Sequence, residues 1–165
     1  MTFAPKTWVV GEVVSAATMN TEIRDQFNSM FAAWTTYTPT WTGATTNPVL
    51  GNGVITGRYI KVGRTCTASI QLTTGSTTTY GSGAYSFGVP FIAASATVAY
   101  IGAARLSGTD TWLGHILLGQ GATVGTLTFS ATATNTRGAN MAAAVPETLA
   151  AGALLRATVT YQTAT

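Results

Sequence analysis

The residues that could perform acid–base or nucleophilic chemistry are few in this chain of 165 residues. After Asp25 the only carboxylates are Asp110 and Glu147. The chain also has a single histidine, His115, and a single cysteine, Cys66. A glycosidase needs two carboxylates about 5 to 9.5 Å apart across the scissile bond, and both acids fall in segments that we expect to be loops. The composition therefore favours a protein without enzymatic activity.

The other arrangements that support catalysis or metal binding are equally poorly represented. A Ser-His-Asp arrangement would have to combine His115 with Asp110, but His115 lies inside an expected strand, where we expect a half-buried ring with a hydrogen-bond partner. One histidine, one cysteine and separated acids do not make a metal site. Cys66 stands at an apolar position of an alternating strand, which indicates an inert buried thiol. We therefore predict no catalytic residue, no metal and no cofactor.

Aromatic residues near expected turns are the remaining candidates for a binding role. Tyr80, Tyr85 and Trp112 lie at or near such turns. Exposed aromatic rings stack on sugar rings or anchor protein interfaces. Tyr85 and Trp112 also fit core positions at strand ends, and the core alternative is the favoured one. The sequence leaves both assignments open.

The composition also limits the partners of the protein. Charged residues make up 8% of the chain, against about 25% in ordinary globular proteins. The formal net charge is +3, and six basic residues oppose two acids after residue 25. These basic residues are scattered along the sequence, so we expect a solvated strand face and no nucleic-acid binding. No apolar run approaches the roughly 20 residues that cross a bilayer, and we expect no membrane partner.

The N-terminal part, residues 1–34, combines an arm with an amphipathic helix. The helix is expected over residues 16–34, with Ser15 as its N-cap, and residues 3–14 are expected to form an extended arm. Apolar residues recur every three or four positions in the helix and therefore share one face. Written as a heptad, the seam of this face contains Ala16, Met19, Ile23, Gln26, Met30 and Ala33.

This apolar face requires burial, because a helix of about 19 residues is marginal in isolation. One alternative is that the face packs against the β part of its own chain. The other is self-association around a symmetry axis, in which Gln26 forms hydrogen bonds between copies and fixes their register. In the second alternative the subunit interface includes Met19, Ile23, Gln26 and Met30.

The second part, residues 35–165, has the pattern of β strands throughout. Apolar and Thr-rich positions alternate over 65–72, 126–131 and 155–162, as expected for a sheet with one buried face. Further strands are expected at 37–42, 54–62, 84–89, 97–105 and 112–118. Clusters of Gly, Asn and Ser separate the strands and mark turns.

About eight strands at this spacing predict an antiparallel β-sandwich of the jelly-roll type. Residues 132–154 are rich in alanine and interrupted by Pro146 and Gly152. We expect them to form a long connection with a short helix over 147–151. The predicted fold is therefore mainly β, with an arm and helix over residues 1–34 and a β head over residues 35–165.

Three segments together resemble virion proteins of tailed phages that infect actinobacteria. The N-terminal segment of minor tail and fibre proteins is similar to WVVGEVVSAATMNTEIRDQFNSMFAAW. The strand pair that follows it is similar to NPVLGNGVITGRYIKVGRTCTASIQL, and a further hairpin to TTYGSGAYSFGVPF. The same modules occur in tail fibres, baseplate proteins and capsid-surface fibres, so the resemblance does not assign the part of the virion.

The resemblance implies a homotrimer whose N-terminal segment attaches to another structural protein of the particle and whose β head faces outward. On this basis we expect a minor tail or tail-fibre protein, made in the host cytoplasm and located in the virion. Its head would contact the host surface, with a cell-wall glycan or a teichoic-type polymer as the expected receptor. The alternatives are a capsid decoration or head-fibre protein that coats or reinforces the shell, and a non-catalytic carbohydrate-binding module.

Overall fold

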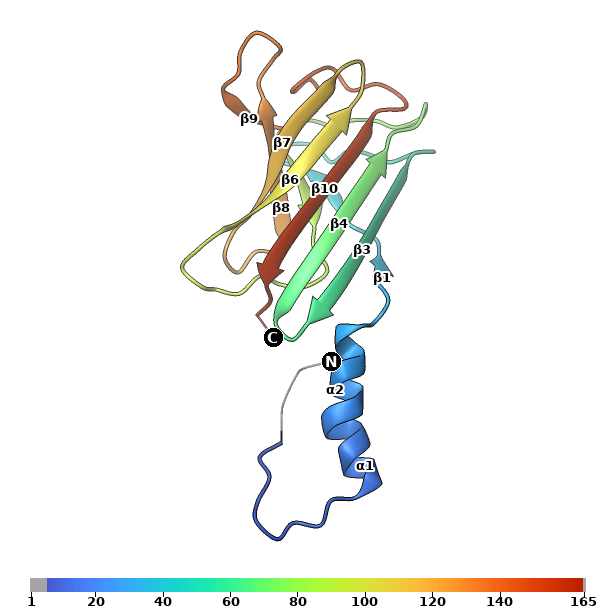
Figure 1. The fold of residues 1–165 in the computed structure, drawn as a ribbon. Helices are drawn as coiled ribbons and strands as arrows, with labels where there is room; N and C mark the ends of the chain where they lie inside the picture. Colours follow the sequence, from blue (N-terminus) through green and yellow to red (C-terminus); the bar gives the residue numbers. More distant parts are fainter. Residues whose placement is uncertain (1–5, 165) are drawn as a thin grey trace.

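The computed structural model of the protein describes residues 6–164, apart from the side chains of Gln26 and Ser29. A short helical segment precedes a large antiparallel β structure (Figure 1). The helical segment extends away from one end of the strands. We call residues 6–14 the arm, residues 16–30 the stalk and residues 35–164 the head. The prediction of a mainly β, antiparallel fold is confirmed.

Ten strands lie within the described part of the head. They are β1 (Thr35–Tyr37), β2 (Trp41–Gly43), β3 (Val54–Val62), β4 (Thr65–Thr73), β5 (Tyr85–Gly88), β6 (Tyr100–Ser107), β7 (Thr111–Leu118), β8 (Val124–Ser130), β9 (Gly138–Asn140) and β10 (Leu154–Gln162). They form one sheet in the order β1-β3-β4-β10-β6-β7-β8-β5-β2, and β9 pairs with β8. Gly51, with a φ of 60°, lies in the turn before β3, as its sequence context predicts.

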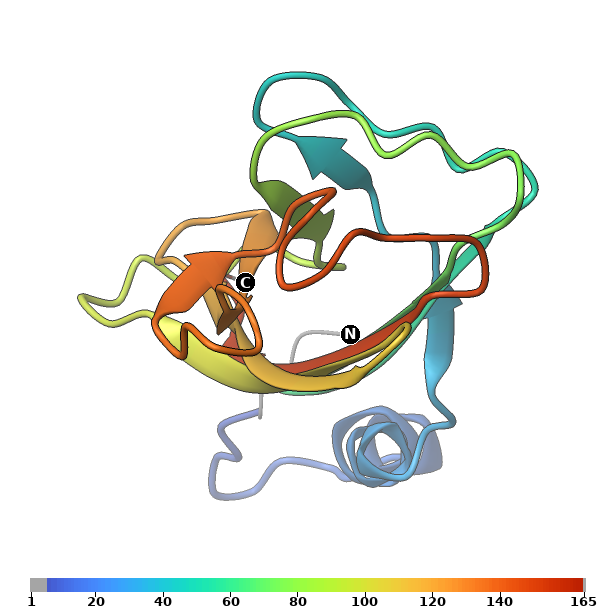
Figure 2. The same cartoon turned by 90° about the horizontal axis from the view of Figure 1, so that it is seen from above.

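The sheet curls around a common core (Figure 2). In this view β2 and β5 lie across the core from β4 and β10. The hydroxyl of Tyr37 on β1 donates to the carbonyl of Gly88 on β5 at 3.4 Å, so a hydrogen bond joins the first strand of the order to the last but one. Fully buried side chains such as Phe87 and Leu155 fill the interior. Burial of these apolar groups is the main term that holds the head together.

The expected strand over 37–42 is two short strands at opposite ends of the strand order, β1 and β2. Pro39 lies between them and is buried. Proline has no N–H to continue a strand ladder, so the ladder stops on either side of it. The chain crosses here from one edge of the curled sheet to the other. The prediction of one strand over 37–42 was therefore wrong.

The connection over 132–154 contains a strand, β9, and no helix over 147–151. The backbone groups that a helix would use pair with other segments instead. The N–H of Leu149 donates to the carbonyl of Ala143 at 2.9 Å, and the carbonyl of Ala150 accepts from the hydroxyl of Thr74 at 2.6 Å. Tertiary partners therefore override the weak helix preference of this segment.

The stalk contains α1 (Ala16–Met19), a π-helical turn (Asn20–Arg24) and α2 (Asp25–Met30). The hydroxyl of Ser15 accepts from the N–H of Thr18 at 3.1 Å, which confirms the predicted N-cap. The expected helix over 16–34 was too long at its C-terminal end, because Phe31 has left the helical conformation. In the part of the chain that the structure describes, no helix has the length and apolar character needed to cross a membrane.

The π-helical turn changes which residues of the stalk share a face. The N–H of Asp25 donates to the carbonyl of Asn20, five residues earlier. One additional residue in a turn rotates the following side chains by about 100° relative to a regular helix. Positions spaced by four residues therefore stay aligned through the turn, which places Phe27 in line with Met19 and Ile23.

Candidate binding surface

The structure brings the two carboxylates of the head to one turn. Glu147 accepts hydrogen bonds from the N–H groups of Thr109 at 2.8 Å and Asp110 at 3.1 Å. It also accepts from Nε1 of Trp112 at 2.9 Å. Burial raises the pKa of Glu147, but these three hydrogen bonds outweigh it and lower the pKa below its ordinary value. A carboxylate held ionised in this way stabilises the turn between β6 and β7 and is a poor proton donor.

His115 and Cys66 lie on opposite sides of the sheet. His115 is exposed on the outer face of β7, which corrects the expectation of a half-buried ring. Asp110 precedes β7, so five residues of extended chain, about 17 Å, separate it from His115. Cys66 is fully buried, as predicted, and burial raises the pKa of its thiol. Among the described residues no three histidine, cysteine or acidic side chains are grouped to hold a metal ion.

Of the three aromatic residues predicted as surface candidates, Tyr85 is a core residue. Its side chain is fully buried, and burial raises its pKa to about 12. Its hydroxyl donates to the carbonyl of Tyr80. The core alternative favoured for Tyr85 is therefore confirmed and its surface alternative is wrong, because the alternation of β5 points this ring inward. Tyr80 and Trp112 are half-buried against the core, so the three rings do not form an exposed platform.

A basic face lies on the outside of β3, β4, β10 and β6. Cross-strand neighbours form two rows on it. One row is Thr56, Gln71, Arg156, Arg105 and Leu113, and the next is Arg58, Ser69, Thr158, Ala103 and His115. The two rows contain three arginines and no carboxylate. We use the name basic face for Arg58, Arg105 and Arg156 together with the hydroxyl side chains Thr56, Ser69 and Thr158.

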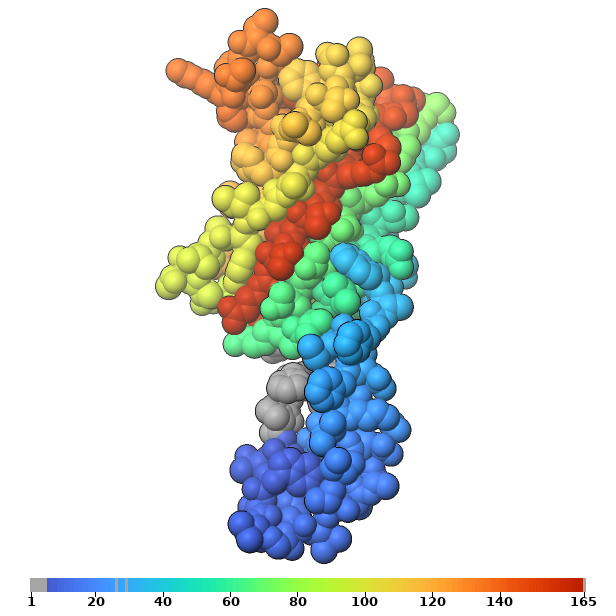
Figure 3. All heavy atoms as spheres, viewed as in Figure 1, coloured from blue at the N-terminus to red at the C-terminus, as the bar shows by residue number. Residues whose placement is uncertain are grey.

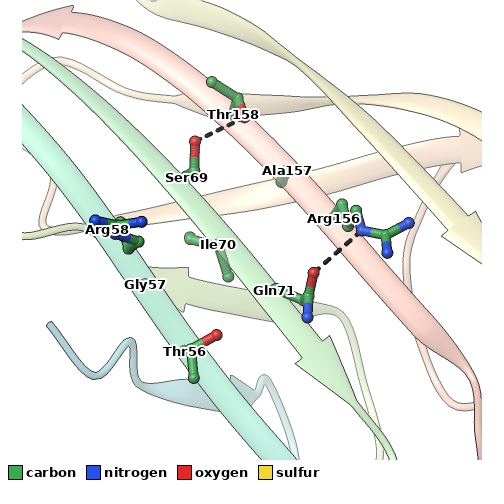
Figure 4. Close-up of a pocket in the computed structure, with 9 residues that line it drawn as sticks. All are labelled: Thr56, Gly57, Arg58, Ser69, Ile70, Gln71, Arg156, Ala157 and Thr158. Carbon is green, nitrogen blue, oxygen red and sulfur yellow. Dashed lines mark hydrogen bonds between the residues drawn. The ribbon is translucent and has the colours of Figure 1, made fainter. Parts of the chain in front are cut away.

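A shallow hollow of about 330 Å³ crosses the basic face between Arg58 and Arg156 (Figure 4). Nε of Arg156 donates to Oε1 of Gln71 at 3.1 Å. The hydroxyls of Ser69 and Thr158 share a hydrogen bond of 3.0 Å. A second hollow of about 280 Å³ is also lined by Arg156 and continues to Arg105. The two hollows therefore lie next to each other along β10, and Arg156, Ala157 and Thr158 line both of them.

Two of the arginines are direct neighbours of like charge. Arg105 on β6 and Arg156 on β10 are Cα partners across the sheet. Like charges at such positions destabilise a sheet by a few tenths to about 1 kcal/mol. Within residues 6–164 the ion pairs are Lys6 with Glu12 and Arg24 with Asp25, both outside the head. The positive charge of the basic face is therefore not balanced by the protein itself.

The stalk leaves its predicted interface residues in solvent. Met19 is 41% exposed, Ile23 38% and Met30 50%. Figure 3 shows the stalk projecting beyond the head, and it is the last helical stretch, α2, that approaches β3. The head therefore does not cover the apolar face of the stalk. The side chain of Gln26 lies outside the described residues, so its predicted hydrogen bonds stay a prediction.

The arm adds more exposed apolar surface next to the stalk. Val9, Val10 and Val13 are all exposed. The arm bends at Gly11, whose φ is 83°, and so it is not extended over its whole length as expected. Lys6 forms an ion pair with Glu12 across this bend. The arm and the stalk together form the part of the protein with the least internal packing.

The basic face was missed at the level of the sequence. Arg58, Arg105 and Arg156 are separated by about fifty residues each and give no local charge cluster. Each stands at an outward position of an alternating strand, which is a signal that the sequence does carry. The order of the strands is needed to see that β3, β10 and β6 bring the three together.

The comparisons with known proteins give no relative on which to base an assignment. No family model, no curated protein and no solved structure matches this chain.

Proposed function

We propose that this protein is a non-enzymatic structural protein of a phage virion that assembles as a homotrimer through its stalk. The observation that carries the proposal is the exposed apolar stalk beneath a well-packed head. An isolated helix as short as residues 16–30 is marginal in water. Burial of Met19, Ile23 and Phe27 between copies would remove their apolar surface from water and stabilise the helix.

In this proposal the three stalks meet along the line of Met19, Ile23 and Phe27. The arm, with its exposed valines, docks to another structural protein of the particle. The head points away from the particle as a jelly-roll-like β-sandwich, whose two halves are the facing parts of the curled sheet in Figure 2. The leading role is that of a minor tail or fibre protein whose head contacts the host surface.

The assembly is tested by placing a charge on the apolar line of the stalk. In a trimer Ile23→Asp would bury three unpaired carboxylates next to one another, which costs about 3 kcal/mol or more and weakens association at least 100-fold. Asn20→Asp adds the same charge to the same stalk away from this line and serves as the matched control. Light scattering after size exclusion measures the mass of each variant. Equal assembly of both variants would contradict the proposed interface.

The place in the virion is tested by electron microscopy of the parent particle labelled with an antibody to this chain. Label at the tail supports the proposed role. Label spread over the capsid would replace that role with the decoration or head-fibre alternative. Particles that carry no label would contradict a virion protein of either kind.

A further inference from the structure

We propose that the basic face binds a linear polymer of hydroxyl-bearing repeats joined by phosphodiesters, laid across β3, β4, β10 and β6. The inference rests on the proposed function in one respect, since it names the class of receptor that the head would contact. Its physical basis is the set of arginines and hydroxyls on this face, together with the two neighbouring hollows that they line.

The dimensions of the basic face favour an extended ligand over a compact one. Neighbouring strands lie about 4.8 Å apart, so the three strand spacings from Arg58 on β3 to Arg105 on β6 cover about 14 Å. Arg156 stands between them on β10. A small anion would contact one or two of these guanidinium groups. A linear chain with regularly spaced charges would contact all three.

The arrangement of the arginines favours phosphate as the charged group. Arg105 and Arg156 come from neighbouring strands and face one another across the sheet. A single arginine fork satisfies a planar carboxylate. The oxygens of a phosphate do not lie in one plane, so two guanidinium groups that approach from different strands can both donate to it. A bound phosphate would also relieve the repulsion between the two arginines.

The side chains between the arginines favour a ligand that is rich in hydroxyl groups. Ser69 and Thr158 continue the row of Arg58 across β4 and β10, and Thr158 lies beside Arg156 on β10 (Figure 4). Each hydroxyl both donates and accepts hydrogen bonds. Among the residues that line the two hollows none is aromatic. No aromatic ring is therefore available in the hollows to stack on a nucleic-acid base or on a neutral sugar ring. Charge and hydrogen bonding are therefore the means of recognition on this face.

A second copy of the chain does not fit the basic face. The head has two acids, Asp110 and Glu147, and Glu147 already accepts three hydrogen bonds from its own turn. The head of a copy therefore has almost no negative charge to place against three arginines, and two of the three acids outside the head, Glu12 and Asp25, already form ion pairs. Charge complementarity selects an anionic partner of a different kind.

The experiment measures binding of the full-length protein to poly(glycerol phosphate) immobilised on a biosensor, at low salt. The double variant Arg105→Gln, Arg156→Gln should weaken binding about 20-fold or more, because each phosphate contact also releases counterions. Arg137→Gln removes the same type of charge from the exposed segment before β9 and should change binding less than twofold. Thermal unfolding of each variant checks that the head remains folded.

Three outcomes would overturn the inference. The first is unchanged binding by the double variant. The second is a loss with Arg137→Gln that equals the loss per removed charge in the double variant, which would show that net charge alone attracts the polymer. The third is tighter binding to oligo(dT) of equal charge, which would assign the face to nucleic acid. Neutral dextran should not bind.

The mass of the same samples separates this inference from the proposed function. A trimer that fails to bind the polymer removes the inference and leaves the assembly in place. A monomer that binds it through Arg105 and Arg156 supports the inference and contradicts the proposed assembly.

Discussion

Glu147 shows how a lone carboxylate serves structure in a protein with few charges. It lies in the connection before β10, yet its hydrogen bonds go to the turn between β6 and β7. Two segments that are distant in sequence are thereby joined at one end of the head. The sequence could show that Glu147 is rare, but it could not show these partners, because they depend on how the strands are arranged.

We expect Glu147→Ala to lower the free energy of unfolding by about 1 kcal/mol at neutral pH, since the half-buried Trp112 and the exposed N–H groups of Thr109 and Asp110 lose their charged acceptor. Asp110→Ala, a change at the exposed acid in the same turn, should have little effect. Chemical denaturation at pH 7 measures both. An equal loss of unfolding free energy in the two variants would show that any substitution at this turn destabilises the protein and that the Glu147 carboxylate has no special role.

The same interaction predicts a dependence on pH. The pKa of Glu147 is lower in the folded protein than its ordinary value of 4.5. The contribution of the ionised Glu147 to the free energy of unfolding is therefore fully present above pH 4.5. It is lost as the pH falls through the folded-state pKa. The stability difference between the wild type and Glu147→Ala should shrink as the pH falls below 4.5. A constant difference over this range would contradict the assigned role.

The repulsion between Arg105 and Arg156 leads us to predict that a substitution of Arg105 stabilises the protein and weakens its binding to the proposed polymer. Arg105→Thr removes a repulsion between direct cross-strand neighbours and places a strand-favouring residue on β6. We expect a gain of about 0.5 kcal/mol in the free energy of unfolding, measured by denaturation in urea. Arg58→Thr is the control, because Arg58 faces Ser69 and should give no such gain. If Arg105→Thr instead lowered the free energy of unfolding, Arg105 would be stabilised by its surroundings, which would contradict the proposed repulsion by Arg156.

Individual strands were largely predictable from the sequence, because alternation is a local property. The strand expected at 54–62 is β3 with the same bounds, and the Thr-rich stretch at 155–162 lies within β10. The strand order was not predictable, because it is set by pairings such as Arg156 with Arg105 that join residues far apart in the chain. The basic face depends on that order and therefore emerged from the structure alone.

The stalk shows a different limit of the sequence pattern. Spacing by three and four correctly predicts a helix after Ser15, but it assumes a regular helix. The π-helical turn at Asn20–Arg24 breaks this regularity. It changes the alignment of the residues that follow, so a heptad written through the turn no longer follows one line. Wider turns of this type are found at functional sites more often than by chance.

This difference gives a prediction for the stalk. With the π-helical turn in place, Phe27 continues the line of Met19 and Ile23, and Phe27→Ala should weaken association about 100-fold, as expected for loss of a large buried side chain. In a regular helix the heptad would instead place Gln26 on the interface. Analytical ultracentrifugation of Phe27→Ala and Gln26→Ala separates the two arrangements. A larger loss with Gln26→Ala would contradict the π-helical turn in the assembled protein.

The whole molecule divides into two parts with different surfaces. The arm and stalk expose valine, methionine and phenylalanine side chains and have no buried core, whereas the head is built around a core of fully buried apolar residues and carries a basic outer face. The head needs no partner to bury its core, but the stalk does. A protein with this division is suited to assemble at one end and to bind at the other.

The mass of the full-length protein in solution tests the central claim most directly. Native mass spectrometry at micromolar concentration should give three times the 17.0 kDa of one chain. Assembly through Met19, Ile23 and Phe27 predicts that this species dominates at neutral pH. A mass of 17.0 kDa under these conditions would contradict the account.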